Sequence, residues 1–280
     1  MKNILITGGT GFVGRYLLSS LENKAYTITL LGRSKHNIYP HIQCDLSKDE
    51  LVLEYLKGIN IIFHLAGHAH DTKSNTITNL LHKKVNYEAT IKLAELAVQA
   101  DVEQFIFLSS VKAGSPLGAS DEYLKDNYNG LSEYGKAKVK AEKSILDIPN
   151  KSNMMVKIIR SPLVYGGGAK GNLALMKNSI QAGWFPPLPE FGNKRSMIHV
   201  KDLVRSMLFI LDKDEANGEV FIVTDGEEYS TCEIYERISY YLNKNIPKYR
   251  IPRFLFYFLG FLSTNLKIKI EKIISNECYT

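Results

Sequence analysis

Short apolar runs alternate with longer segments of helical periodicity along the first part of the chain. The runs predict strands at residues 2–7, 26–31, 38–44, 59–65, 104–109 and 155–159. The segments between them predict helices at residues 14–23, 48–57, 80–100 and 133–146. Strands that are apolar throughout are typical of parallel sheets covered on both faces, and their alternation with helices is the pattern of βαβ units. The sequence therefore predicts an α/β fold with a doubly wound parallel sheet.

The regular alternation ends near Tyr165. A glycine run at 166–168 follows, and then the aromatic and proline-rich segment 184–189. We expect one domain over residues 1–165 and a smaller, mainly substrate-binding region over residues 166–280, with some segments, such as 219–223, returning to the sheet. Two interpretations of Trp184 and Phe185 remain open: they line a ligand pocket, or they fill a small core.

The composition is that of an ordinary globular protein, with 45% apolar and 23% charged residues among 280. It excludes a disordered chain, a collagen-like repeat and a disulfide-framed miniprotein. The 35 basic and 29 acidic residues give a net charge of +6, which favours anionic ligands and does not by itself indicate nucleic acid. Cys44, Cys232 and Cys278 are too few and scattered for a disulfide framework or a zinc site. We therefore expect a cytoplasmic protein without a bound metal.

The most hydrophobic stretch runs from Phe254 to Leu262. It is too short to span a hydrocarbon core, which needs about 20 residues. We expect a buried or interfacial helix here and no membrane insertion. Because the first predicted strand begins at Lys2, we also expect no signal peptide.

A glycine-rich turn, Thr7-Gly8-Gly9-Thr10-Gly11-Phe12-Val13-Gly14, connects the first predicted strand to the first predicted helix. In such a turn the first glycine permits the bend, the next lets backbone approach a pyrophosphate, and the last lets helix pack on strand. The free N–H groups of the helix N-terminus then bind phosphate. The flanking strand and helix favour this interpretation over a structural turn. They predict a Rossmann-type dinucleotide site contacted by Gly8, Thr10, Gly11, Phe12, Val13 and Gly14.

The end of the second predicted strand bears on which nicotinamide cofactor binds. NAD enzymes usually place an acidic residue there for the ribose hydroxyls, whereas this chain has Gly32 and Arg33. A guanidinium can pair with a 2′-phosphate, so the sequence favours NADP(H), with NAD(H) as the alternative and a solvated loop charge as the other interpretation of Arg33. Asp45 and Leu46 follow the third strand, where Asp45 can accept from the adenine amino group, cap the following helix, or do both.

Several further motifs occur in the order of a known family: the glycine turn, Asp45-Leu46, 64–67, Asn86, Ser109-Ser110, 134–138, 160–166 and 195–203. On these motifs the chain resembles the extended short-chain dehydrogenase/reductases, the NAD-dependent epimerase/dehydratase family, from about residue 2 to 225. The ordered set is far more specific than any single motif. The resemblance implies an NAD(P)-dependent oxidoreductase or epimerase.

The resemblance implies that Tyr134 is the catalytic acid/base, and the chemistry agrees. A phenol with a pKa near 10 is a poor base at neutral pH. Lys138 lies one helical turn later on the same face, so its charge is expected to lower the pKa of the phenol and its amine to bind the nicotinamide ribose. Ser110, at the end of a strand, would hydrogen-bond the reacting oxygen. Taken alone, a Tyr and a Lys four residues apart are usually a surface pair.

In the family an asparagine in the long helix holds the site's backbone and the cofactor, a role that falls on Asn86, although an exposed helix residue is the alternative. The other cofactor contacts implied are Leu65, Ala66, Gly67, Ser109, Ser161 and Pro162. His64 is expected to pack in its strand and His199 to serve as a structural hydrogen-bond partner. The grouping of His64, His68 and His70 follows a parallel strand at the cofactor's edge, so we expect no metal there.

The resemblance extends to the substrate. Arg195 corresponds to the family's arginine for a nucleotide diphosphate, and Asn172 is a second candidate contact for the diphosphate or the sugar. The continuation Ser110-Val111-Lys112-Ala113 departs from the usual epimerase pattern and looks like a bacterial subgroup acting on UDP-N-acetylhexosamines for surface polysaccharide. Because a net reductase typically draws on NADPH, Arg33 favours a 4-keto reductase.

Several alternatives remain. A UDP-glucose or UDP-N-acetylglucosamine 4-epimerase is the first. A dehydratase is disfavoured, because its usual Asp-Glu pair would directly follow the active-site serine, whereas Asp121-Glu122 lies well beyond it. A non-catalytic dinucleotide sensor typically loses the Tyr or the Lys, and a reductase of small carbonyls would not need Arg195. A homodimer through the helices at 80–100 and 133–146 is expected by analogy alone.

Overall fold

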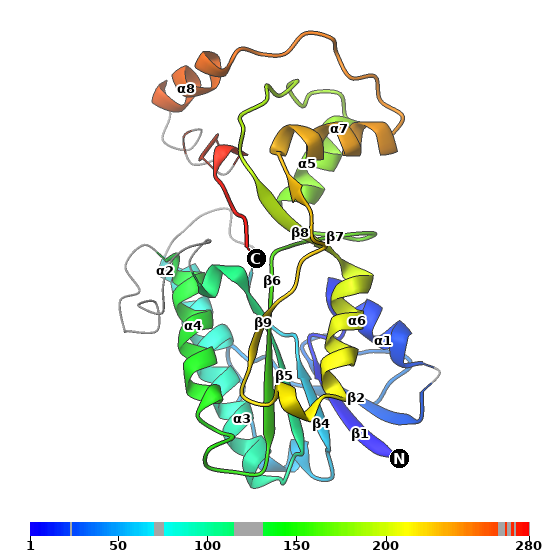
Figure 1. The fold of residues 1–280 in the computed structure, drawn as a ribbon. Helices are drawn as coiled ribbons and strands as arrows, with labels where there is room; N and C mark the ends of the chain where they lie inside the picture. Colours follow the sequence, from blue (N-terminus) through cyan, green and yellow to red (C-terminus); the bar gives the residue numbers. More distant parts are fainter. Residues whose placement is uncertain are drawn as a thin grey trace. The chain divides into compact units, whose positions relative to one another are not determined.

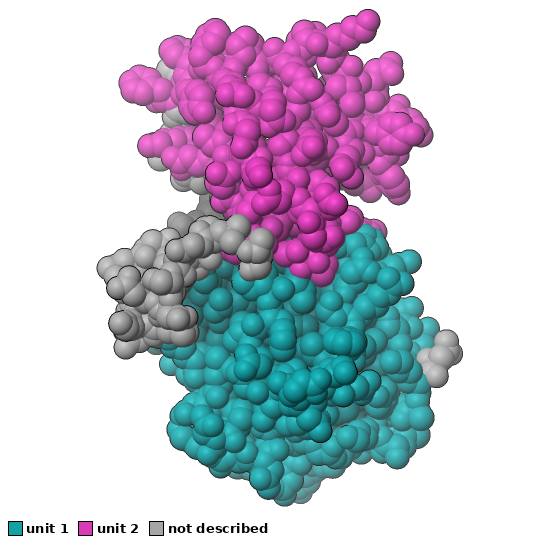
Figure 2. Space-filling model, in the orientation of Figure 1, with its two compact units in different colours: residues 1–162, 199–223 teal, residues 163–198, 224–280 magenta. Residues whose placement is uncertain are grey.

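The computed structural model describes residues 1–22, 24–69, 76–114, 131–262, 267, 270–271 and 273–279. The chain forms two compact units (Figure 2). Unit 1 contains residues 1–162 and 199–223, and unit 2 contains residues 163–198 and 224–280.

A seven-stranded parallel sheet forms the centre of unit 1 (Figure 1). Its order is β3-β2-β1-β4-β5-β6-β9, and all of its strand pairs are parallel. The strands are β1 (Lys2–Thr7), β2 (Tyr26–Gly32), β3 (His41–Gln43), β4 (Ile61–His64), β5 (Gln104–Ser110), β6 (Met155–Ser161) and β9 (Val220–Ile222). This confirms the α/β fold with a doubly wound parallel sheet of Rossmann type.

The strand order reverses between β1 and β4, which pair directly through Thr7 and His64. In open α/β sheets such a reversal leaves a crevice at the carboxyl ends of the strands, where ligands bind. The glycine turn follows β1, and residues 65–67 follow β4. Two of the predicted cofactor-binding segments therefore lie at the carboxyl ends of β1 and β4, where the strand order reverses.

Helices cover both faces of the sheet (Figure 1). On one face, Leu93, Ala97 and Ile145 join Phe105 and Val156 in a continuous apolar core. On the other, α1 packs against α6, which also contacts β5 and β6. The helices of unit 1 are α1 (Phe12–Leu21), α2 (Thr76–Leu81), α3 (Ala89–Gln99), α4 (Glu133–Leu146) and α6 (Val200–Leu211), with shorter 3-10 turns η1 (Leu53–Leu56), η3 (Val111–Ala113) and η5 (Asp214–Ala216).

Two predicted helices differ in the structure. Residues 48–57 form only the 3-10 turn η1, because Asp45 and Ser47 close a tight turn and Val52 is extended (φ −120°, ψ 150°). The long helix predicted at 80–100 is interrupted by the π-helical segment η2 (His82–Glu88) between α2 and α3. π-helical turns are rare overall, and those that occur are often found at functional sites. Apolar periodicity cannot distinguish such a turn from an α-helix.

Within the part of unit 2 that the structure describes, a three-stranded sheet in the order β10-β8-β7 is accompanied by helices. The strands are β7 (Leu163–Tyr165), β8 (Arg195–His199) and β10 (Glu228–Tyr229), and the helices are α5 (Asn172–Gln181), α7 (Thr231–Tyr241) and α8 (Arg253–Leu262). A core of Ile180, Leu188, Tyr235 and Phe256 joins the helices. Phe185 stacks on Tyr235 in this core, whereas Trp184 is 71% exposed.

Candidate active site

The glycine turn has the geometry of a phosphate cradle. Gly8 has φ +71°, and a Cβ there would lie 2.8 Å from the backbone N of Ala66. A Cβ on Gly14 would lie 2.4 Å from the Gly8 carbonyl oxygen, so α1 can approach the turn only because this residue is glycine. A Cβ on Gly11 would meet only the Gly8 oxygen, at 3.0 Å.

Gly11 is also the N-cap of α1, and no side chain caps the first turn of this helix. The free N–H groups and the positive end of the helix dipole favour an anion at this position. The residues present therefore fit a dinucleotide diphosphate. Thr10 is exposed, and Phe12 and Val13 are half-buried, beside this cradle.

The catalytic residues expected from the sequence meet at the end of β5. Ser132 caps α4 by accepting from the Gly135 N–H at 3.2 Å. A Cβ on Gly135 would lie 2.2 Å from the carbonyl oxygen of Lys112, so glycine here lets η3 approach the start of α4. This close approach brings the Ser110 side chain into hydrogen-bonding contact with the phenol of Tyr134.

Lys138 lies one turn after Tyr134 and is buried. Its Nζ donates to the Leu108 carbonyl oxygen at 3.0 Å and lies 4.4 Å from the centre of the Phe107 ring. Burial lowers the pKa of Lys138 to about 8, partly offset by the negative charge of Glu142. At neutral pH the lysine is therefore mostly charged, and it loses that charge far more readily than an exposed lysine.

Burial raises the pKa of Tyr134 to about 12. A hydrogen bond with Ser110 lowers this pKa, and the negative charge of Glu142 raises it. In the protein alone the net shift is thus upward, which is contrary to the lowering expected from Lys138. The desolvation of the phenolate outweighs the other effects, because burial removes hydration that the charged form needs most.

Glu142 continues the line of Tyr134 and Lys138 along α4. Arg160, on β6, donates to both oxygens of this carboxylate, with Nη2 to Oε2 at 2.5 Å. The Glu142 side chain is 2% exposed. The Glu142 carboxylate is therefore buried one helical turn after Lys138, and Arg160 balances its negative charge.

Asn86 is fully buried and holds the backbone that follows β4. Its Oδ1 accepts from the His68 N–H at 2.7 Å, and its Nδ2 donates to the His68 carbonyl oxygen at 2.9 Å. A Cβ on Gly67 would lie 3.2 Å from Asn86 Oδ1 and 3.6 Å from Lys138 Nζ. Asn86, Gly67 and Lys138 are therefore neighbours, as their common assignment to the cofactor site requires.

The other expected cofactor residues lie at the same edge of the sheet. Leu65 N–H donates to the Thr7 carbonyl and Ala66 N–H to the Thr7 hydroxyl. Ser109 is buried, and within the described residues its hydroxyl has no hydrogen-bond partner. Such an orphaned hydroxyl fits a site that is completed by a ligand. Ser161 and Pro162 are buried at the end of β6, where Ser161 contacts the Ser109 carbonyl at 3.4 Å.

The adenine end of the expected site lies beyond β2 and β3. Asp45 Oδ1 accepts from the N–H and the hydroxyl of Ser47. The pKa of Asp45 is lowered chiefly by the Ser47 N–H, with a smaller contribution from the positive charge of Arg33. Asp45 thus closes a turn, and no α-helix follows for it to cap. Leu46 packs partly against the core, and Arg33 is exposed.

The histidines have structural contacts. His64 is fully buried between the hydroxyls of Thr7 and Thr90, at 2.7 and 2.9 Å. Burial, with the charge of Lys138, lowers the pKa of His64 to about 3, so it is neutral. His199 caps α6 by accepting from the Lys201 N–H. The described residues contain no cluster of potential metal ligands, while His70, like Asp121 and Glu122, lies outside them.

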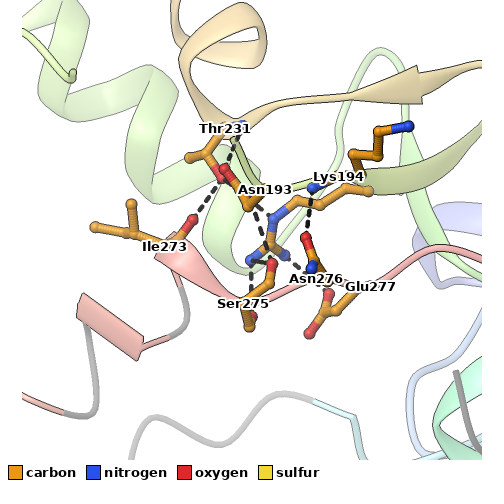
Figure 3. Close-up of polar contacts among 8 residues, drawn as sticks. Asn193, Lys194, Thr231, Ile273, Ser275, Asn276 and Glu277 are labelled. Carbon is orange, nitrogen blue, oxygen red and sulfur yellow. Dashed lines mark hydrogen bonds and ion pairs between the residues drawn. The ribbon is translucent and has the colours of Figure 1, made fainter. Parts of the chain in front are cut away.

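The substrate residues expected from the sequence lie in unit 2 and have different surroundings. Asn172 is exposed at the start of α5. Arg195 is 8% exposed, and residues near the end of the chain contact its guanidinium (Figure 3). Nη1 pairs with Glu277 at 2.8 Å, Nη2 donates to the Ser275 hydroxyl at 3.1 Å, and Nε donates to Thr231 at 3.2 Å. An anionic ligand of Arg195 would have to replace or share these contacts.

The segment that contacts Arg195 is held by its backbone. Ser196 N–H donates to the Glu277 carbonyl, and Glu277 N–H donates to the Lys194 carbonyl. Lys194 N–H also donates to the side chain of Asn276, and Thr231 donates to the Ile273 carbonyl (Figure 3). Within unit 2, residues 276–277 therefore lie beside the start of β8, and Ile273 lies beside the start of α7.

Three neighbours of these residues were not identified from the sequence. The ring of His82 lies 5.5 Å from that of Tyr134, and its Nδ1 lies 3.2 Å from Asn86 Nδ2. Glu142 and Glu277 are the other two. The spacing of four residues between Tyr134, Lys138 and Glu142 was a signal that could have indicated Glu142. Nothing local indicates Glu277, which is 82 positions from Arg195.

A doubly wound parallel sheet, a glycine cradle at a helix N-terminus and a Ser-Tyr-Lys cluster beside it define a dinucleotide-dependent oxidoreductase. The chain belongs to the NAD dependent epimerase/dehydratase family, whose model matches residues 4–224. This confirms the resemblance seen in the sequence and identifies the protein as an enzyme of this class. None of the helices in the described part of the chain is long and apolar enough to cross a membrane.

Two curated relatives are similar over most of their length. The chain is 33% identical over 265 residues to a UDP-glucose 4-epimerase of Vibrio cholerae, covering 90% of this chain and 78% of the relative. It is 27% identical over 256 residues to an N-acetyl-alpha-D-glucosaminyl-diphospho-ditrans,octacis-undecaprenol 4-epimerase of Escherichia coli O157:H7, covering 89% and 75%.

Solved structures share the fold at lower identity. MoeE5 in complex with UDP-glucuronic acid and NAD has a TM-score of 0.74 and 21% identity, covering 99% of this chain and 94% of the other. The UDP-N-acetylglucosamine 4-epimerase of Methanobrevibacter ruminantium, in complex with UDP-N-acetylmuramic acid, has a TM-score of 0.73 and 21% identity, covering 88% and 83%. At this identity the likeness shows the fold alone.

Proposed function

We propose that the protein is an NAD(P)-dependent oxidoreductase acting at C4 of a UDP-hexose or UDP-N-acetylhexosamine, and that its reaction is 4-epimerisation. The observation that carries the proposal is the cluster of Ser110, Tyr134 and Lys138 beside the glycine cradle. The Vibrio cholerae relative, named a UDP-glucose 4-epimerase, supports the choice of reaction.

Each residue of the cluster has a role in this proposal. Tyr134 removes the proton of the C4 hydroxyl and later returns it. Ser110, in hydrogen-bonding contact with the phenol, holds the reacting oxygen. Lys138 binds the nicotinamide ribose and stabilises negative charge near the phenol. The bound nicotinamide supplies the hydride acceptor and donor. Asn86 keeps residues 67–68 in place beside the lysine.

The proton transfer needs compensation for the raised pKa of Tyr134, about 12. We assign this compensation to the positive charge of Lys138, which lies one helical turn after Tyr134 and donates to the Leu108 carbonyl oxygen near the end of β5. We expect the phenol to become an effective base only when ligands fill the site and add hydrogen bonds to its oxygen.

A second candidate reaction is the NADPH-dependent reduction of a UDP-4-keto-hexosamine for surface polysaccharide. Arg33 favours it, because the end of β2 carries this guanidinium and no carboxylate. A carboxylate at that position would repel a 2′-phosphate, whereas a guanidinium pairs with one. The two reactions share the same proton and hydride transfers and differ in whether the cofactor is consumed.

Incubation with UDP-N-acetylglucosamine or UDP-glucose distinguishes these reactions from each other and from no activity. We expect interconversion of the 4-epimers, measured by nuclear magnetic resonance, without net loss of cofactor. Stoichiometric oxidation of added NADPH with a UDP-4-keto-6-deoxy-N-acetylhexosamine, and no epimer formation, would establish the reductase instead. If the wild type, with bound nucleotide verified, catalyses neither reaction, the proposed function is refuted.

A further inference from the structure

Helix α8 in unit 2 exposes a stripe of large aromatic side chains. Phe254, Tyr257, Phe258 and Phe261 are 67%, 55%, 57% and 88% exposed. Their spacing of i, i+3, i+4 and i+7 places them on one face of the helix. We call these four residues the aromatic stripe. On an ordinary surface helix this outer face carries polar residues.

The same helix is held to unit 2 by a different face. Phe256 is 6% exposed, and its ring makes an edge contact with Phe191, with 5.4 Å between centroids. Both rings belong to the core that includes Tyr235 and Ile270. The sequence predicts a buried or an interfacial helix; in the structure, one face of α8 is packed in unit 2, and the opposite face is apolar and open to solvent.

Positive charge is concentrated around α8. Residues 243–272 contain seven of the chain's 35 basic residues and one of its 29 acidic residues, so the other 250 residues contain 28 of each sign. The whole net charge of +6 therefore belongs to this segment. Lys244, Lys248, Arg250 and Arg253 are exposed just before or at the start of the helix.

Most of this charge is not neutralised within the described residues. Arg250 pairs with Glu236, and Lys267 approaches Glu271 at 4.0 Å. No ion pair involves Lys244, Lys248 or Arg253 in the part of the chain that the structure describes. The exposed tyrosines Tyr240, Tyr241 and Tyr249 lie in the same part of the sequence, at 83%, 77% and 70% exposure.

We propose that α8 docks unit 2 onto a lipid bilayer that contains anionic phospholipids. The helix would lie in the plane of the interface, with the aromatic stripe at the boundary between headgroups and acyl chains. Lys244, Lys248 and Arg253 would contact the negative surface of the bilayer. Tyrosine and phenylalanine beside basic residues are the side chains that suit this boundary.

Charge favours a bilayer over a second copy of this chain. Two copies that met through their aromatic stripes would bring two segments of like charge together, which opposes association. An anionic membrane instead supplies the opposite charge. The helix has ten residues, about 15 Å at 1.5 Å per residue, so it docks at the surface and does not cross the bilayer.

Sedimentation of the full-length protein with vesicles tests the proposal. We expect binding to phosphatidylcholine vesicles that contain phosphatidylglycerol, and at least about tenfold weaker binding to phosphatidylcholine alone, because the basic flank contributes by charge. Raising the salt concentration should weaken the binding to anionic vesicles. No binding to anionic vesicles, or equal binding to both kinds, would overturn the proposal.

The triple variant Phe254→Gln, Phe258→Gln, Phe261→Gln tests the stripe. We expect at least about a tenfold loss of binding to anionic vesicles. The matched control is Phe209→Gln, because Phe209 on α6 of unit 1 is 66% exposed, nearly the same as Phe254. Binding unchanged in the triple variant, or lost equally in the control, would contradict the assignment to α8.

Charge reversal tests the flank separately. Lys244→Glu, Lys248→Glu, Arg253→Glu should weaken binding to anionic vesicles at least about tenfold and leave the salt dependence nearly flat. Far-ultraviolet circular dichroism verifies that each variant is folded. If the wild type instead self-associates in light scattering and ignores vesicles, the stripe is an interface between copies and the membrane proposal is wrong. Vesicle binding requires no catalytic turnover, so it is independent of the proposed function.

Discussion

The two units present their candidate site residues in different ways. In unit 1, Ser110, Tyr134 and Lys138 have their positions fixed by the end of one strand and the first turns of one helix. In unit 2, Arg195 takes its contacts from residues 36, 80 and 82 positions away. A short sequence motif therefore predicts the surroundings of a site residue when neighbouring strands and helices build the site. When segments distant in sequence complete the site, the motif does not predict those surroundings.

The largest expected effect tests whether the reacting groups belong to unit 1. Tyr134→Phe removes the proton donor and acceptor and leaves the ring in place. We expect turnover to fall by about 10³-fold, with cofactor affinity nearly unchanged, as measured by sugar interconversion and by fluorescence titration of the reduced cofactor. Full activity in this variant would remove the assigned acid/base.

A second change separates chemistry from stability within unit 1. The buried charge of Lys138 is costly, because its pKa falls from 10.5 to about 8. A shift of this size corresponds to about 3 kcal/mol. Lys138→Met is therefore expected to lose activity and to be more stable than the wild type at neutral pH, measured by urea unfolding.

The difference in stability between the wild type and Lys138→Met should change with pH in a defined direction. Below pH 8 the lysine is charged in the folded and unfolded states, and the full cost applies. Between pH 8 and 10.5 only the unfolded state keeps its proton, so the wild type gains stability as pH rises and its difference from Lys138→Met shrinks. Lys157→Met is the control for turnover, since Lys157 is also fully buried but contacts Gln104 and Leu211. A pH-independent difference would refute this account of Lys138.

Arg33→Asp examines the choice of cofactor at the edge of unit 1. We expect the affinity for NADP(H) to fall about 10- to 100-fold, because a charge-assisted pair becomes a repulsion. The affinity for NAD(H) should change little. Arg33→Lys keeps the charge without the bidentate geometry and should be intermediate. Parallel titrations with both reduced cofactors measure the difference, and an unchanged preference would show that Arg33 does not contact the 2′-phosphate.

The smallest expected effect concerns unit 2. If Arg195 binds the substrate's diphosphate, the carboxylate of Glu277 competes with it. Glu277→Gln should then strengthen UDP binding about three- to tenfold in calorimetry, because a partly exposed ion pair is worth little. Glu227→Gln, at another exposed glutamate of unit 2, is the matched control. Weaker binding in Glu277→Gln would mean that this side chain supports the ligand site.

The sequence predicts much of unit 1 because its signals are local. The apolar runs place β1 and α4 at the bounds that the structure shows, Lys2–Thr7 and Glu133–Leu146. The helix predicted at 48–57 is wrong, because the hydrogen bonds of Asp45 with Ser47 compete with helix formation. The sequence also could not indicate the upward shift of the Tyr134 pKa, which depends on how completely the fold excludes water from the phenol.

The unexpected parts of the site depend on contacts between distant segments. Asn86 bonds the backbone of His68, 18 positions away, and this pairing accompanies the π-helical turns of η2. Arg195 could be identified as a candidate from its neighbours in sequence, but its burial and its pairing with Glu277 require the folded unit 2. Hydrophobic periodicity carries no information on either arrangement.

The π-helical segment η2 has a consequence for insertions and deletions in this enzyme. Each of its hydrogen bonds closes over five residues rather than four, so the segment contains more residues than α-helical turns with the same number of bonds. Removing one residue, such as Lys84, would allow an uninterrupted α-helix and would rotate everything before it by about 100° relative to α3. His82 would then turn away from Tyr134 while Asn86 kept its place. The number of residues in η2 thus determines which side chain lies beside the phenol of Tyr134.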